Sequence, residues 1–169
     1  MDDLTNSQTE KDLQDAFAGE SQANRKYLAF AEQADKEGYP QAAKLFRAAA
    51  EAETVHALAY LRALDGIGKT LDNLKEAVNG ETHEFKEMYP PMIEAAASAG
   101  FAAAERSFRY ANEVEEVHAN LYQKMMDNLD SSQSVDYYVC LICGNTLEAE
   151  PQVPCTVCKA GSKMFKKII

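Results

Sequence analysis

Four predicted helices each carry a glutamate on the face that a helical bundle would bury. Residues 7 to about 129 are rich in Ala, Glu, Leu, Lys and Gln, which favour helix, and their apolar residues recur at steps of three and four. Gly38-Tyr39-Pro40, Gly66-Ile67-Gly68 and Gly100 separate four such stretches, and Pro90-Pro91 is predicted to end or kink the third near Tyr89. The carboxylates that interrupt the apolar faces are Glu20, Glu53, Glu81, Glu84 and Glu115. The chain is therefore predicted to begin with an all-α four-helix bundle whose core is partly acidic.

Two of these helices add a histidine to their glutamate. The motifs Glu53-x-x-His56 and Glu115-x-x-His118 each follow a glutamate on the preceding helix, by 33 and 34 residues respectively. Residues three apart share one helix face, and buried carboxylates are costly unless cations lie between them. One such motif alone is usually a solvated, salt-bridging face, whereas two in register match the donor set of di-iron and di-manganese carboxylate bundles. Glutamate with histidine suits Fe, Mn or Zn better than Mg or Ca.

Two tyrosines lie near these acidic positions. Tyr27 follows Glu20 by seven residues, and Tyr89 follows Glu84 by five. Each is either an ordinary core aromatic or a hydrogen-bonding neighbour of the metals. We expect both to be residues of the site, as hydrogen-bonding neighbours of the metals.

The four cysteines of the chain all lie near its end. The pairs Cys140-x-x-Cys143 and Cys155-x-x-Cys158 are 11 residues apart, a spacing that can close a tetrahedral site of four thiolates. So short a segment buries little core and needs a metal to fold. Four thiolates serve zinc in structural ribbons and iron in electron carriers, and a neighbouring redox site that needs single electrons favours iron, with zinc as a substitute. The predicted domains are a bundle at 1–130, a polar linker at 131–136 and a β-rich metal domain at 137–169.

The charge of the chain excludes several classes of partner. Asp and Glu number 27 against 17 Lys and Arg, a net charge of -10, so we expect neither nucleic acid nor a membrane surface as a partner. The start, MDDLTNSQTEKD, is acidic and polar, unlike a signal peptide, and indicates a cytoplasmic protein. A glycine-rich nucleotide-binding motif is absent from the sequence, so a pyridine nucleotide would act through a separate protein.

Taken together, these motifs closely resemble the rubrerythrin family, in which a ferritin-like di-iron bundle precedes a rubredoxin-like domain. The resemblance covers nearly the whole chain and is strongest at 16–23, 53–56, 81–84, 87–90, 115–118 and the two cysteine pairs. It implies that Glu20, Glu53, Glu81 and Glu115 are iron ligands, with Glu53 and Glu115 bridging. It also implies that His118 completes the second iron, and that Glu84 and His56 are alternative ligands of the first, exchanged as the site changes oxidation state. The second cysteine pair departs from isolated rubredoxins, reading Cys-Thr-Val-Cys-Lys where those usually have Cys-Pro-x-Cys-Gly, which leaves its redox potential open.

The same resemblance implies a function. It indicates a non-haem di-iron peroxidase that reduces hydrogen peroxide to water in oxidative-stress defence. Electrons would come from an external NAD(P)H-linked reductase or rubredoxin-type donor through the four-cysteine iron, in a head-to-tail homodimer. Two alternatives remain: a ferroxidase or iron-handling protein with Fe(II) as substrate, and an electron-transfer or zinc-ribbon protein whose bundle is structural.

Overall fold

The structure is a computed structural model that describes residues 4–131 and 134–169. Positions 132 and 133 of the predicted linker therefore lie outside the described residues. The chain forms two compact units, Met1–Gly68 and Lys69–Ile169. No helix in the described part of the chain is long and apolar enough to cross a membrane.

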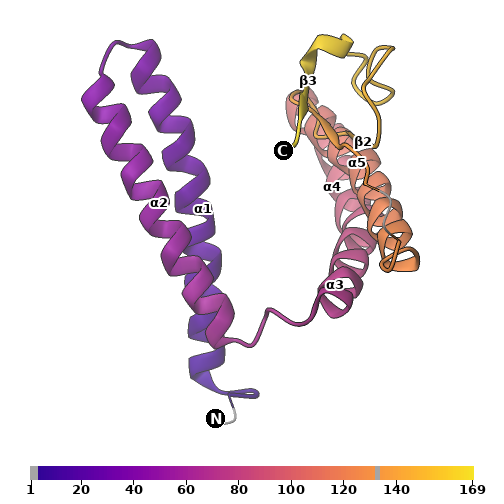
Figure 1. Cartoon of the computed structure of the whole chain (residues 1–169). Coiled ribbons are helices and arrows are strands. Elements are labelled where there is room, and N and C mark those ends of the chain that lie inside the picture. Colours follow the sequence, from indigo (N-terminus) through magenta and orange to yellow (C-terminus); the bar gives the residue numbers. More distant parts are fainter. Residues whose placement is uncertain (1–3, 132–133) are drawn as a thin grey trace. The chain divides into compact units, whose positions relative to one another are not determined.

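The first unit is an antiparallel pair of long helices, α1 (Gln8–Lys36) and α2 (Pro40–Ala63) (Figure 1). The hydroxyl of Ser7 accepts a hydrogen bond from the backbone N–H of Glu10 and so caps the start of α1. Gly38, at φ +82°, provides the left-handed turn between the helices, and Pro40 occupies the first turn of α2, where no backbone donor is needed. The predicted break at Gly38-Tyr39-Pro40 is thus confirmed.

Alanines form the buried seam of this hairpin. The buried apolar residues of the two helices are Ala31, Ala34, Ala43, Ala50 and Ala57. Side chains this small let two helix backbones approach closely. Tyr27, Phe30 and Phe46 pack beside this seam, with ring centroids 5.6 to 6.3 Å apart.

The helices of the second unit are α3 (Thr70–His83), α4 (Tyr89–Ser98) and α5 (Ala102–Asp127). A π-helical turn, η1 (Glu84–Met88), joins α3 to α4, so residues 70–98 run as one helical segment that packs against α5. The N–H of Tyr89 bonds to the carbonyl of Glu84, five residues back. Pro90 and Pro91 lack backbone N–H donors, yet they do not end the helical segment. The π turn before them holds one extra residue, which rotates the helix face that follows by about 100°.

The rest of the second unit is a small three-stranded antiparallel sheet in the order β2-β1-β3 (Figure 1). Its strands are β1 (Tyr138–Cys140), β2 (Thr146–Leu147) and β3 (Phe165–Lys167), with a short 3-10 helix, η2 (Ser162–Met164), before β3. Val139 pairs with Thr146 on one side and Lys166 on the other. An all-helical part followed by a small β-rich part is therefore confirmed.

Candidate metal centres

The first hairpin brings three predicted ligands together. Glu20 on α1 and Glu53 and His56 on α2 each place a donor atom so that all three atoms lie within 4.8 Å of one another. Nδ1 of His56 is 2.8 Å from Oε2 of Glu53, as expected for residues three apart on a helix. The His56 side chain is 53% exposed and that of Glu53 only 17%, so the imidazole lies at the rim of this half-site.

A buried asparagine supports this half-site. The side-chain amide of Asn24 donates to the carbonyl of Ala50 at 2.7 Å and to the hydroxyl of Thr54 at 2.9 Å. Asn24 lies one turn after Glu20, and Thr54 directly follows Glu53. These bonds fix α1 against α2 beside the carboxylates. Sequence reasoning missed Asn24, although a polar residue one turn from Glu20 on the same helix face was a usable signal.

The second unit builds a half-site of the same kind. Glu81 on α3 and Glu115 and His118 on α5 place their donor atoms within 4.8 Å of one another. Nδ1 of His118 is 2.8 Å from Oε2 of Glu115 and 3.8 Å from Oε1 of Glu81. The Glu-x-x-His geometry of the first half-site is therefore repeated here at the same distance.

The carboxylates of this half-site repel one another. Burial raises the pKa of Glu81 to about 7, helped by a hydrogen bond and charge repulsion from Glu115. Burial, followed by the charge of Glu115, also raises the pKa of Glu84. Such crowded acids are unfavourable without a cation, and with a histidine among them they form a donor set that fits iron.

The two candidate tyrosines lie in different surroundings. The pKa of Tyr89 is raised by burial and then by the charges of Glu84, Glu115 and Glu81, so its hydroxyl lies within the field of the second half-site. Tyr89 also packs on Phe108, with ring centroids 6.3 Å apart. The Tyr27 ring, by contrast, belongs to the aromatic cluster of the first unit.

The four cysteines converge as predicted. Their sulfur atoms lie within 4.8 Å of one another, with Cys140 and Cys158 3.6 Å apart and Cys143 and Cys155 also 3.6 Å apart. Metal–sulfur bonds of about 2.3 Å in a tetrahedron place the sulfurs about 3.8 Å apart, so the cage has the size that iron or zinc requires.

Hydrogen-bond donors prepare one of these thiols, that of Cys155, for a metal. Burial acts to raise the pKa of Cys155, but hydrogen bonds from the backbone N–H groups of Cys158 and Val157 and from the thiols of Cys143 and Cys158 outweigh it and lower the pKa to about 7. Burial raises the pKa of the Cys143 and Cys158 thiols. The side-chain amide of Asn145, which is only 1% exposed, lies 3.6 Å from the sulfur of Cys155 and 3.4 Å from the hydroxyl of Thr156. Asn145 therefore offers an N–H···S hydrogen bond of the kind that tunes thiolate-bound iron.

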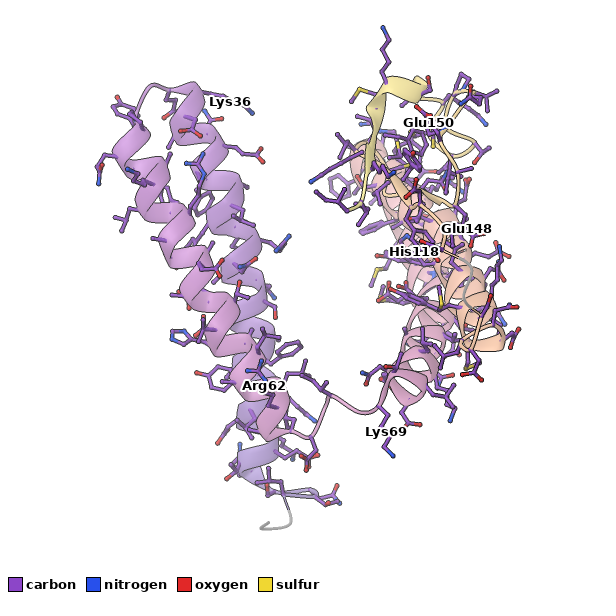
Figure 2. The ribbon with its side chains drawn as sticks, in the orientation of Figure 1. Lys36, Arg62, Lys69, His118, Glu148 and Glu150 are labelled. Carbon is purple, nitrogen blue, oxygen red and sulfur yellow. The ribbon has the colours of Figure 1, made fainter. Side chains whose placement is uncertain are left out.

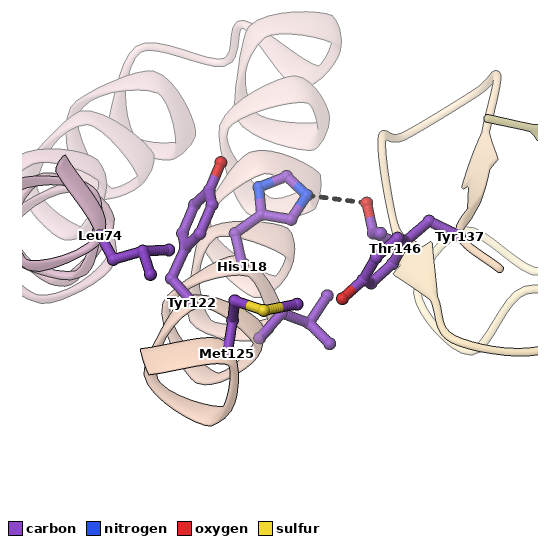
Figure 3. A pocket seen from close by; sticks show the side chains of 7 residues that line it. Leu74, His118, Tyr122, Met125, Tyr137 and Thr146 are labelled. Atoms are coloured by element: carbon purple, nitrogen blue, oxygen red, sulfur yellow. Dashed lines mark hydrogen bonds between the residues drawn. The ribbon is translucent and has the colours of Figure 1, made fainter. Parts of the chain in front are cut away.

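The four-cysteine part of the second unit packs on α5. Nε2 of His118 is 3.0 Å from the hydroxyl of Thr146, the first residue of β2 (Figure 3). Glu148, one residue beyond β2 (Figure 2), pairs with Lys124 on α5. A pocket of about 310 Å³ lies at this junction, lined by Leu74, His118, Leu121, Tyr122, Met125, Tyr137 and Thr146. The contact between Thr146 and His118 could not be read from the sequence.

Comparison with known proteins places the chain in a family. The rubrerythrin family model matches residues 11–126. Rubrerythrin-2 of Clostridium acetobutylicum is 34% identical over 96% of this chain and 98% of its own length, and nigerythrin of Nitratidesulfovibrio vulgaris is 35% identical over 89% and 81%. The structure of fully reduced, all-ferrous nigerythrin matches with a TM-score of 0.56 at 30% identity, covering 98% of this chain and 91% of that one. The chain therefore belongs to the rubrerythrin family, whose members are di-iron oxidoreductases of the oxidative-stress response.

Proposed function

We propose that this protein is a non-haem di-iron peroxidase that reduces hydrogen peroxide to water. The observation that carries the proposal is the repeated half-site. Each hairpin holds a Glu-x-x-His motif with Nδ1 and Oε2 2.8 Å apart, next to a glutamate from the partner helix. Two such halves together supply the donors of one carboxylate-bridged pair of irons.

The proposed iron ligands are the seven acidic and histidine residues predicted from the sequence. Glu53 and Glu115 would bridge, His118 would hold the second iron, and His56 and Glu84 would alternate on the first. The complete set is Glu20, Glu53, His56, Glu81, Glu84, Glu115 and His118.

The reaction consumes two electrons and two protons for each hydrogen peroxide and yields two waters. Bound iron supplies redox chemistry for cleaving the O–O bond. The chain's own residues bind and orient the peroxide and hold protons near it. Tyr89 is suited to this task, because its hydroxyl lies in the field of Glu84, Glu115 and Glu81 and, like that of any tyrosine, is protonated at physiological pH and able to donate a hydrogen bond. Tyr27 is proposed for a similar role beside the first half-site.

The four-cysteine site would return electrons to the bundle. We propose that Cys140, Cys143, Cys155 and Cys158 bind an iron. This iron would receive its electrons from an external NAD(P)H-linked reductase or rubredoxin-type donor. We propose a reducing compartment such as the cytoplasm, because a site of four thiolates requires reduced cysteines. We also propose the domain division at 1–130, 131–136 and 137–169, and a head-to-tail homodimer.

Peroxide turnover by site variants tests the proposal. Anaerobically reduced, iron-loaded protein is mixed with hydrogen peroxide, and Glu84→Ala and His56→Ala are measured beside it. We expect both variants to be slower, whereas Glu87→Ala, an exposed glutamate three residues after Glu84, keeps the rate. Undiminished turnover in both site variants would contradict the exchange of ligands. Rapid uptake and release of Fe(II) without peroxide turnover would instead indicate an iron-handling protein.

A further inference from the structure

The two histidines of the half-sites differ in their second ring nitrogen. Both direct Nδ1 at a glutamate three residues earlier, at 2.8 Å. Nε2 of His118 meets the hydroxyl of Thr146 at 3.0 Å, whereas Nε2 of His56 has no hydrogen-bond partner within the part of the chain that the structure describes. The His118 side chain is 27% exposed and that of His56 53%. The His118 imidazole therefore has a hydrogen-bond partner at both ring nitrogens, whereas that of His56 has one at Nδ1 alone among the described residues.

The hydrogen bonds of Thr146 favour one proton position on His118. The Thr146 hydroxyl lies 3.1 Å from the carbonyl of Gly144, to which it can donate its single hydrogen. A hydroxyl oxygen that donates there accepts from Nε2 of His118, which then carries the hydrogen. Nδ1 is left as the nitrogen that can bind a metal, and it is the one that faces Glu115 and Glu81.

The surroundings hold Thr146 at this position. It follows the first cysteine pair, where Gly144, at φ +86°, faces α5; a Cβ there would be in ordinary van der Waals contact with Val114, 3.6 Å from its Cγ1. The Lys124–Glu148 ion pair attaches the same segment to α5 two residues farther on. The pocket around His118 and Thr146 is mostly apolar in its side chains, which favours a direct hydrogen bond over competition from water (Figure 3).

We propose that Thr146 is a positioning residue for the metal site: its hydroxyl accepts the Nε2 hydrogen of His118 and fixes the ring with Nδ1 toward the carboxylates. The four-cysteine part thus completes the support of a bundle ligand. The same support distinguishes His118, the proposed ligand in both oxidation states, from His56, the proposed exchanging one. The inference rests on the proposed role of His118 as a ligand.

Zinc binding and NMR test the role of Thr146 without relying on turnover. Full-length protein is prepared with zinc in the four-cysteine site, and further Zn(II) is titrated against a chelator while ¹H–¹⁵N spectra follow the His118 ring. Thr146→Val is expected to weaken this second binding by about 10- to 100-fold and to expose the Nε2 hydrogen to rapid solvent exchange. Thr146→Ser, which keeps the hydroxyl, should restore both properties. Gln152→Ala, at an exposed residue of the four-cysteine part, should leave both at the wild-type value.

The controls separate the possible failures. Zinc content of the four-cysteine site, equal in all variants, shows that the domain remains folded. Thr146→Val with wild-type affinity and wild-type protection of the Nε2 hydrogen would overturn the positioning role. His118→Ala is titrated in parallel. If it binds the second zinc as tightly as wild type, the assignment of His118 as a ligand fails. If His118→Ala loses affinity for this zinc and Thr146→Val does not, only the role of Thr146 fails.

Discussion

The carboxyl groups of Glu81 on α3 and Glu115 on α5 lie within 4.8 Å of each other, and burial together with this neighbour raises the pKa of Glu81 to about 7. Two neighbouring acids within a helical unit destabilise the metal-free protein. They stabilise the metal-bound protein when a cation lies between them. The stability of the metal-free protein should therefore report this contact directly.

Metal-free protein is expected to lose stability as the pH rises from about 4.5 to about 7. In this window the folded protein keeps the proton of Glu81 while the unfolded chain, with a pKa of 4.5, has released it, so raising the pH favours unfolding. Above about pH 7 this contribution levels off. Urea unfolding followed by circular dichroism at several pH values measures the slope, and Glu81→Gln should flatten it. An equally steep slope in Glu81→Gln would show that another group is responsible.

The buried alanine seam should not tolerate larger residues. Ala43 is fully buried between α1 and α2, so Ala43→Leu is expected to destabilise the first unit by about 1–3 kcal/mol through overpacking. The neighbouring Ala42 is exposed, and Ala42→Leu should change stability by less than about 0.5 kcal/mol. Thermal or urea unfolding of the two variants compares them. Equal effects at both positions would contradict close packing at Ala43.

Asn145 should stabilise the four-cysteine site and raise its potential. Asn145→Ala removes a buried donor to the sulfur of Cys155, and we expect a loss of about 1–3 kcal/mol together with a lower reduction potential of the iron-loaded site. Gln152→Ala, at an exposed residue of the same domain, should change neither. Redox titration of the visible iron–thiolate absorption measures the potential. A potential unchanged in Asn145→Ala would show that the N–H···S bond does not tune this iron.

The buried asparagine of the first hairpin should matter as much as the alanines. Asn24→Ala removes the bonds to Ala50 and Thr54 and leaves their polar atoms without this donor, so a loss of about 1–3 kcal/mol is expected. Asn24→Asp tests the donor separately, because it keeps the shape but cannot donate to the Ala50 carbonyl when ionised. Urea unfolding checks both. Wild-type stability in both variants would contradict a structural role for this amide.

Local spacing made much of this molecule predictable. Glu53 and His56, like Glu115 and His118, are three apart on one helix, so their contact depends only on helix geometry. The two Cys-x-x-Cys pairs likewise predict their own convergence. The breaks at Gly38 and Gly100 follow from the left-handed backbone that glycine adopts readily.

Other features depend on tertiary contacts and could not be read from the sequence. The π turn at Glu84–Met88 is one of several ways to accommodate Pro90-Pro91, and the sequence alone does not choose among a stop, a kink and an inserted residue. Thr146 and His118 are 28 residues apart in sequence, and they meet only because the four-cysteine part packs on α5. Asn24 and Asn145 resemble ordinary polar residues until their burial is known.

Iron analysis of protein prepared without oxygen tests the central claim most directly. Metal content, visible absorption and Mössbauer spectra are measured on the same sample. We expect about three irons per chain, two in a coupled carboxylate-bound pair and one bound by four thiolates, with the pair lost in a Glu53→Ala, Glu115→Ala double variant and the thiolate iron retained. A colourless protein with zinc in the thiolate site and no metal at the glutamates and histidines would contradict the account.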